Sequence, residues 1–371
     1  MEQRYLQDKY LSNLAEKAKR KELFSIQEQI SYLRYKGINI LEKDEALVED
    51  ILKNRTYYFK VTAYRKNFST DKYGKFVNLS FLQLADLAKI DMYLRMILGK
   101  MIFELEHSLK TLLLKFITES NIDGYNIVHE FNEYTKKNYL KYELKKRNEN
   151  IDNASEMAKQ LILQNYTDTS EKIMNNVNGE FGYDVDFYQH HHQKISIWAL
   201  LEIMTLNQLN TFIIFYCDNK YYGYKNLIIA QNILKYVTNV RNACAHNRPL
   251  IYNIVDINQF NKSSKKQNRK KRRQTISLTQ FLQKANVDRN YHKFLTNKKM
   301  NDIVAVIYLH DTYIHTKEMK QKDAEALFGL INRIKREKDF YQNNQELKER
   351  FYLFQSIVQY YSKKNNFPNL S

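Results

Sequence analysis

Residues 80–117, SFLQLADLAKIDMYLRMILGKMIFELEHSLKTLLLKFI, carry the longest regular apolar pattern in the chain. Leucine, isoleucine and methionine return every three or four positions from Leu84 to Leu113, and this spacing places them on one face of an α-helix. A stripe of this length predicts a central helix, broken at most once, around which the other elements pack. The 371 residues include only eight glycines and two prolines, and so few helix breakers favour long helices over hairpins. We therefore expect an all-α fold.

Shorter helical patterns lie on both sides of this stretch. Ser25 and Glu28 have the spacing of a capping box and are expected to begin a helix that stops at Gly37. We expect a helical extension over residues 1–24 and one helical domain over 25–371. That domain is predicted to have its core at about 80–255, a basic disordered loop at 262–274 and C-terminal helices at 278–362. Further helices are predicted at residues 44–52, 133–147, 197–206, 209–216, 226–246 and 300–309, and a helical pattern runs from 323 to 362.

The chain is strongly basic, with 59 Lys and Arg against 41 Asp and Glu and a net charge of +18. Such a charge attracts polyanions, so nucleic acid is the first candidate partner and an anionic membrane surface the second. No segment approaches the roughly 20 apolar residues that span a bilayer. Cys217 and Cys244 are the only cysteines, which fits a reducing compartment better than a disulfide framework. We expect a cytoplasmic protein that does not bind membranes.

The pattern over residues 226–246 ends in a group of chemically useful side chains. Arg241-Asn-Ala-Cys-Ala-His246 comes just before Pro249, which marks the end of the helix. Five residues turn an ideal helix by about 500°, so Arg241 and His246 diverge by about 140° and are expected to flank a groove. Asn242 lies four residues before His246 on the same face, where its amide can hold the imidazole or a phosphate oxygen.

Arginine and histidine are the residue types that cleave RNA without a metal ion. An imidazole titrates near neutral pH, so it can take the proton of a 2′-hydroxyl or protonate the leaving oxygen. A guanidinium binds phosphate oxygens in pairs and stabilises charge that develops on phosphorus. One such pair supplies half of these groups, so we expect a homodimer that presents the pair twice. The alternative is an ordinary helix end, with Arg241 in a surface ion pair and His246 beside the helix dipole.

The same stretch resembles a known family. Residues 234–253, LKYVTNVRNACAHNRPLIYN, are similar to the signature of the Abi-like (AbiD/AbiF) abortive-infection proteins, in which an Arg-Asn-x-Cys-Ala-His block precedes an arginine and an aromatic-Asn pair. Four further blocks occur in the family's order. They resemble its opening helix (29–36), its Tyr-Tyr-Arg block (57–68), its long helix (91–110) and its Trp-x-x-x-Glu segment (197–205).

This resemblance implies an all-α bundle of the HEPN type, usually dimeric, in which Arg-x4-6-His is the ribonuclease motif. Arg241, Asn242 and His246 match that motif with a spacing of four. Such proteins are implicated in abortive infection by phage, and some relatives pair with a small structured RNA that acts as an antitoxin. The chain departs from the family pattern at Lys110, at Phe59-Lys60 and at Asn247, where arginine, Arg-Leu and a second histidine are usual.

Basic and aromatic residues elsewhere are predicted to contact RNA, because rings stack on bases while cations meet phosphates. The predicted RNA-binding residues are Tyr57, Tyr58, Lys60, Tyr64, Arg65, Lys66, Lys136, Lys137, Arg248, Lys265, Lys266, Arg269, Lys270, Lys271, Arg272 and Arg273. For the aromatic residues, the alternative is a place in the core. Arg95, Glu106 and Lys110 are assigned a supporting role at the site, although Asp91/Arg95 and Glu106/Lys110 also have the spacing of ordinary helix ion pairs.

No metal or other cofactor is expected. His190, His191 and His192 are consecutive, point in different directions on a helix and lack a partner cluster, so they predict a solvated loop rather than a zinc site. The Arg241/His246 pattern and the family resemblance together predict a metal-independent endoribonuclease that is dimeric and acts on RNA. The resemblance implies that it is of abortive-infection or toxin type in phage defence, with a structured small RNA as a regulatory partner. The rival hypothesis is a non-catalytic RNA-binding or scaffold protein that uses the same basic surface.

Overall fold

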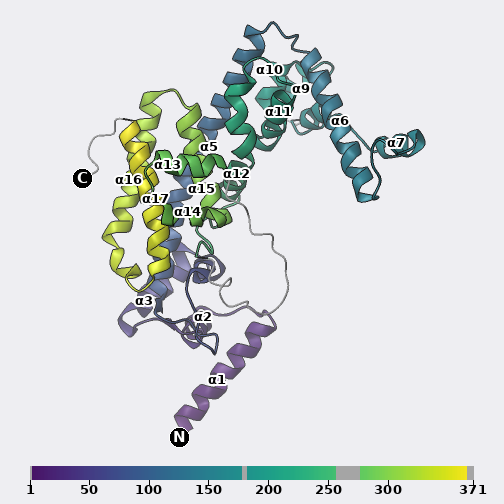
Figure 1. Ribbon diagram of the computed structural model, residues 1–371. Coiled ribbons are helices and arrows are strands. Elements are labelled where there is room, and N and C mark those ends of the chain that lie inside the picture. Colours follow the sequence, from purple (N-terminus) through teal and green to yellow (C-terminus); the bar gives the residue numbers. More distant parts are fainter. Residues whose placement is uncertain (1, 178–181, 256–275, 366–371) are drawn as a thin grey trace. The chain divides into compact units, whose positions relative to one another are not determined.

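The computed structural model describes residues 2–177, 182–255 and 276–365 and is drawn in Figure 1. Helices make up most of this described part, which confirms the all-α prediction. The two strands found there, β1 (Ile38–Asn39) and β2 (Leu79–Ser80), have two residues each and pair in parallel. The basic loop predicted at 262–274 lies outside the described residues.

The chain forms two compact units. One, called here the terminal unit, contains residues 1–102 and 239–371, and the other, called the insert unit, contains residues 103–238. Helix α5 (Phe81–Glu119) leads from the terminal unit into the insert unit, and α12 (Ile228–Ala245) leads back. Residues from both ends of the sequence therefore belong to one unit. The predicted division into an extension over 1–24 and a domain over 25–371 stays a prediction.

The terminal unit contains most of the helices, including short 3-10 and π segments labelled η. Its elements besides β1, β2 and the parts of α5 and α12 are α1 (Glu2–Lys19), α2 (Ile26–Tyr35), η1 (Glu42–Asp44), α3 (Glu45–Asp50), η2 (Ile51–Arg55), α4 (Tyr58–Thr62), η3 (Ala63–Asn67), α13 (Ile276–Lys284), α14 (Arg289–His292), η6 (Lys293–Thr296), α15 (Lys298–Tyr313), α16 (Lys317–Arg336), η7 (Lys338–Tyr341) and α17 (Gln345–Lys364).

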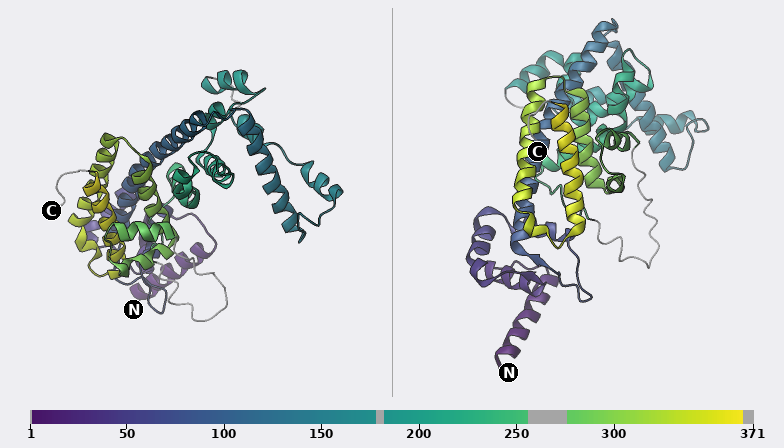
Figure 2. Two further views of the ribbon diagram at one scale, coloured as in Figure 1. Left: turned by 45° about the horizontal axis from the view of Figure 1, so that its top comes forward. Right: turned by 60° about the vertical axis from the view of Figure 1, so that its left-hand side comes forward.

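The insert unit is built around α6, which packs against α7, α8 and α11. Its elements besides the parts of α5 and α12 are α6 (Asn126–Lys146), α7 (Glu156–Leu163), α8 (Thr169–Asn175), α9 (Tyr183–His191), α10 (Ile197–Ile203), α11 (Leu206–Asp218) and η4 (Tyr224–Leu227). His190 and His191 end α9 and His192 is its C-cap, so the predicted loop is instead the end of a helix. Figure 2 shows α6 and the shorter α7 in two further views.

The predicted central helix is a single unbroken element, α5. Its apolar stripe is buried as the spacing predicted, because residues three and four apart lie on one face. Buried members of this stripe include Leu84, Leu87, Leu94, Leu98, Leu105, Leu109 and Leu113. The capping box is confirmed as well: the Ser25 hydroxyl accepts the backbone N–H of Glu28, and the Glu28 carboxylate accepts the backbone N–H of Ser25.

The pattern over residues 323–362 forms two helices rather than one. Helix α16 ends at Arg336, η7 reverses the chain, and α17 runs back beside α16, as Figures 1 and 2 show. Asn344 caps α17 by accepting the backbone N–H of Leu347 at 2.9 Å. The sequence carries no glycine or proline between the two helices, so the break depends on this cap and on packing.

The β1–β2 pair fixes the segment that leads to the candidate site. Ile38 pairs with Leu79 and Asn39 with Ser80, so the chain from residue 40 to residue 78 leaves and returns at one place. Gly37 allows this because its φ of +83° favours glycine, and an added Cβ would lie 2.6 Å from the carbonyl oxygen of Phe76. The two ends of the segment that contains α4 and η3 are therefore held together at the start of α5.

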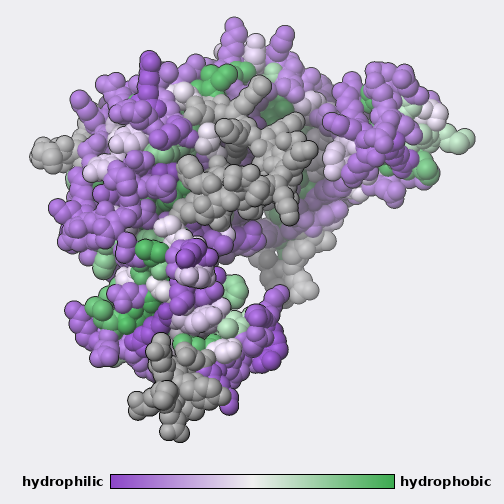
Figure 3. All heavy atoms as spheres, turned by 60° about the horizontal axis from the view of Figure 1, so that its bottom comes forward, coloured by the Kyte–Doolittle hydropathy of each residue, from purple (hydrophilic) through white to green (hydrophobic). Residues whose placement is uncertain are grey.

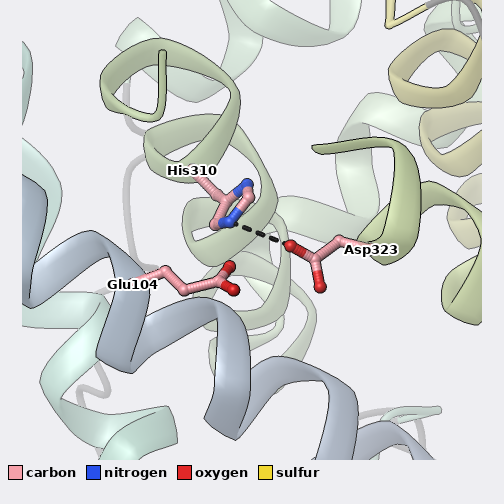
Figure 4. A group of neighbouring side chains, drawn as sticks. All are labelled: Glu104, His310 and Asp323. Atoms are coloured by element: carbon pink, nitrogen blue, oxygen red, sulfur yellow. Dashed lines mark ion pairs between the residues drawn. The ribbon is translucent and has the colours of Figure 1, made fainter. Parts of the chain in front are cut away.

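A buried polar group joins the C-terminal helices. Nε2 of His310 lies 3.3 Å from Oδ2 of Asp323, as Figure 4 shows, and the Tyr361 hydroxyl lies 2.8 Å from Nδ1 of His310. The Lys100 ammonium is 2.6 Å from Oδ1 of Asp323 and supplies the positive charge there. Glu104, also drawn in Figure 4, lies on the part of α5 that belongs to the insert unit. We interpret the group within the terminal unit as a polar link between α5, α15, α16 and α17.

None of the described helices is both long enough and apolar enough to cross a membrane.

Candidate active site

The candidate catalytic residues lie where α12 ends. The helix stops at Ala245, and the next turn closes with two backbone hydrogen bonds, from Arg248 N to Ala243 O at 2.8 Å and from Asn247 N to Cys244 O at 3.2 Å. This pair of bonds is a Schellman motif, which needs a residue with a left-handed backbone. Asn247 takes that place with a φ of +51°. Asparagine tolerates this conformation better than most residues, which explains Asn247 where the family usually has histidine.

Arg241, Asn242 and His246 remain accessible at this helix end. Arg241 is half-buried, and the side chains of Asn242 and His246 are exposed. Among the residues that the structure describes, neither the guanidinium of Arg241 nor the imidazole of His246 has a hydrogen-bond or ion-pair partner. The alternative interpretation placed Arg241 in a surface ion pair, and no such pair is formed among the described residues. The Asn242 amide forms no hydrogen bond with the imidazole, so its predicted orienting contact stays a prediction. The three side chains are available to a ligand.

Buried residues from other parts of the terminal unit form hydrogen bonds with the turn that follows His246. Asp91 accepts the backbone N–H groups of Leu250 and Ile251, each at 2.7 Å, and forms an ion pair with Arg95. Arg95 also donates to the carbonyl of Arg248 at 3.4 Å. Asp91 and Arg95 are both buried. Their i to i+4 spacing is that of an ordinary helix pair, but here the pair also fixes the chain just after His246.

Lys60 of α4 also forms hydrogen bonds with this turn. Its ammonium donates to the backbone carbonyl of Asn247 and lies 3.3 Å from the Asn247 side-chain oxygen. The Lys60 side chain is buried, and this burial, followed by repulsion from Arg95, lowers the pKa of Lys60. A cation at a helix C-terminus is favourable because the last carbonyls carry partial negative charge. Lys60 was predicted to bind RNA, and this contact corrects that prediction: its ammonium is used inside the protein.

Asn67 and Asn297 hold the rest of the turn. Asn67 donates to the carbonyl of Ile251 at 2.9 Å and accepts the backbone N–H of Ile254 at 2.8 Å, while Asn297 donates to the carbonyl of Asn253 at 3.0 Å. Neither asparagine was predicted from the sequence to hold this turn. No local signal marks Asn67, because it acts on a segment that is distant in sequence. Asn297 caps α15 by accepting the backbone N–H groups of Lys299 and Met300, but this local role does not reveal its contact with Asn253.

The aromatic and basic segment at 57–68 divides between surface and core. Tyr64 is fully buried, and burial together with the neighbouring Asp91 raises its pKa. It cannot stack on a base, so that prediction is wrong. Tyr58 is half-buried, and its pKa is raised to about 12 by burial. Tyr57 and Lys66 are exposed and Arg65 is half-buried, and their contact with RNA stays a prediction.

The other predicted RNA-binding residues are spread over the chain. Arg248 is exposed beside His246. Lys136 and Lys137 lie on α6 of the insert unit, where they line a hollow of about 510 Å³ with Glu130, Glu133 and Tyr134. Figure 3 shows that the face turned to the viewer is mostly hydrophilic, with apolar residues in small patches. Seven predicted cations lie outside the described residues: Lys265, Lys266, Arg269, Lys270, Lys271, Arg272 and Arg273.

The assigned supporting residues do not form one group. Arg95 belongs to the cluster around the turn, as described above. Glu106 and Lys110 form an ion pair of 3.0 Å on the part of α5 that lies in the insert unit, and Lys110 also donates to the carbonyl of Glu202 at 3.2 Å. These contacts link α5 to α10, so the ordinary helix-pair interpretation accounts for them.

The cysteines do not supply a nucleophile. Cys244 lies next to the candidate residues, against Gly99 of α5, where an added Cβ would be 3.7 Å from the Cys244 Cβ. Burial raises the pKa of the Cys244 thiol to about 11, and that of Cys217 to about 11 as well. Both thiols are therefore protonated at neutral pH, whereas the thiolate is the reactive form.

Comparison with known proteins assigns the family. The chain matches the profile described as Abi-like protein over residues 50–253, which is more than half of its length. This protein belongs to the Abi-like family. The matched region contains Lys60, the Asp91/Arg95 pair and the turn that carries Arg241 and His246, and the family is associated with abortive infection of phage-infected bacteria. A search of curated proteins and a search of solved structures gave no match.

Proposed function

We propose that this Abi-like protein is a metal-independent endoribonuclease of the HEPN type that acts in abortive infection. The observation that supports this most is the pair Arg241 and His246, whose side chains have no polar partner among the described residues. They lie at an accessible helix end whose turn is fixed by buried groups. Preorganised charged groups contribute most to catalysis when their positions do not have to change during the reaction. The net charge of +18 provides the attraction for RNA.

In the proposed reaction the 2′-hydroxyl of RNA attacks the adjacent phosphorus and the 5′-oxygen leaves. His246 of one copy accepts the 2′-hydroxyl proton, and His246 of a second copy protonates the leaving oxygen. Arg241 stabilises the charge on the phosphorane, and Asn242 orients the phosphate. The products carry a 2′,3′-cyclic phosphate and a 5′-hydroxyl. We further propose that a bound structured RNA holds this activity in check.

The experiment that tests the function uses the purified full-length chain and RNA in the presence of EDTA. The proposal predicts cleavage without a divalent cation and a 2′,3′-cyclic phosphate on the upstream product. Binding is measured in the same samples. If RNA is bound but never cut, with or without RNA that co-purifies with the protein, the non-catalytic RNA-binding function is correct and the nuclease proposal fails.

The proposed dimer makes a separate prediction. If each composite site needs both copies, a dimer with one His246→Ala subunit is inactive. Random assembly of wild type and His246→Ala, co-expressed in equal amounts, leaves about a quarter of the dimers fully wild type. We therefore expect cleavage per total protein to fall to about a quarter of the wild-type value. A fall to about half, in line with the fraction of wild-type chains, would show that each chain acts alone.

A further inference from the structure

Two exposed aromatic rings lie at the start of α4, the helix that contacts the candidate site through Lys60. Tyr57 is 62% exposed and Phe59 is 83% exposed. Phe59 directly precedes Lys60, whose ammonium contacts Asn247, and Asn247 directly follows His246. Consecutive Cα atoms are about 3.8 Å apart, so Phe59 begins one residue from a side chain that touches the turn at His246.

Contacts at both ends of this segment keep it in place. Lys60 joins α4 to Asn247, and Asn67 at the end of η3 joins the chain to Ile251 and Ile254. Between these two points, Val61 and Tyr64 are fully buried. Tyr57 and Phe59 lie just before this stretch, and the Tyr57 carbonyl accepts the backbone N–H groups of Lys60 and Val61 at 3.0 and 3.2 Å. The backbone that carries the two rings is therefore joined to the anchored residues, while both rings are exposed.

The neighbouring charges suit a nucleic acid. Arg248 and Lys66 are positively charged and exposed, and Arg65 is positively charged and half-buried. Base faces stack on aromatic side chains without regard to sequence, and nearby cations meet the phosphates. A base in a duplex is already stacked and paired, so only an unpaired base can present its face to Phe59 at low cost.

We propose that Phe59 and Tyr57 form a stacking platform for an unpaired nucleobase next to the phosphodiester that Arg241 and His246 hold. The substrate class is therefore single-stranded or looped RNA. This inference rests on the proposed nuclease function for the identity of the neighbouring phosphate, but the platform itself is tested by binding alone. Phe59 was not among the residues predicted from the sequence to bind RNA, whereas its neighbour Lys60 was.

The test measures binding of a short RNA containing the fluorescent base 2-aminopurine, offered as a single strand and as a duplex. Every protein carries His246→Ala so that cleavage during the binding measurement is strongly slowed. We expect the single strand to bind more tightly and its fluorescence to be quenched. Adding Phe59→Ala should weaken this binding about 5- to 150-fold, which corresponds to ~1–3 kcal/mol for one stacked base. Phe59→Trp should restore binding, because it restores an aromatic face.

Tyr73→Ala provides the matched control. Tyr73 is 76% exposed and has the Lys72 ammonium 4.9 Å from its ring centre, so it has the same chemistry on a different loop. We expect its removal to leave RNA affinity unchanged. Equal binding by the Phe59→Ala variant and its parent would overturn the platform, and so would equal losses from Phe59→Ala and Tyr73→Ala. Cleavage by otherwise wild-type protein separates the two proposals, since a protein that cuts RNA equally well with Phe59→Ala keeps the nuclease and loses the platform.

Discussion

Replacing His246 by alanine is expected to slow RNA cleavage by about 10²–10⁴-fold, the usual contribution of a general acid or base. The imidazole is exposed and has no partner among the described residues, so its loss removes no stabilising contact there. The free energy of unfolding should therefore change by less than about 0.5 kcal/mol, as for most surface substitutions. Cleavage rates in EDTA, RNA affinity and thermal unfolding are the measurements.

His315→Ala is the matched control for this substitution. His315 is an exposed histidine just after the end of another helix of the terminal unit, α15. Its removal should change neither cleavage nor binding. A His246→Ala protein that cuts RNA at the wild-type rate would contradict the assignment of His246, and equal effects of the two substitutions would show that the loss is not specific to the site.

Replacing Asp91 by alanine is expected to cause the largest loss of stability. Asp91 is fully buried, pairs with Arg95 and accepts the backbone N–H groups of Leu250 and Ile251. Alanine would leave the Arg95 guanidinium buried without its carboxylate and two backbone donors without an acceptor. Breaking a buried ion pair by removing one partner typically costs about 3–5 kcal/mol. Denaturant unfolding of the full-length chain measures this loss.

Asp50→Ala is the control for the buried position of Asp91. Asp50 pairs with Arg55, and the side chains are 38% and 62% exposed, so this pair is far more accessible than Asp91 and Arg95. Exposed ion pairs contribute about 0–1 kcal/mol, so this variant should unfold almost as the wild type does. Asp91→Asn should fall between the two alanine variants, because its carbonyl oxygen can still accept the backbone N–H groups. An Asp91→Ala protein as stable as Asp50→Ala would refute the role of Asp91 in holding the turn after His246.

The elements that the sequence predicted well are those whose stability is local. The apolar stripe of α5 and the capping box at Ser25 are signals within one helix, and the structure has both. The end of α12 before Pro249 was predicted for the same reason. By contrast, the break between α16 and α17 lacks a glycine or proline, so the apolar pattern alone could not place it.

The surroundings of the candidate site could not be predicted because they depend on contacts between distant residues. Lys60 and Asn247 are 187 positions apart, and Asp91 and Leu250 are 159 apart. Helix α4 has five residues, too few to show a helical period, so the sequence did not separate the buried Tyr64 from the exposed Tyr57. A lysine in a basic, aromatic segment is typical of RNA binding, and only the fold reveals that Lys60 instead binds a helix end.

A double-mutant cycle on Arg241 and His246 tests most directly whether both side chains act on the same phosphodiester. Cleavage rates are compared for wild type, Arg241→Ala, His246→Ala and the double variant, on one RNA in EDTA. Residues that act as a unit have strongly non-additive effects on the rate. We predict that the double variant is about as slow as His246→Ala alone. Two effects that simply multiply, or an Arg241→Ala protein with the full wild-type rate, would contradict it.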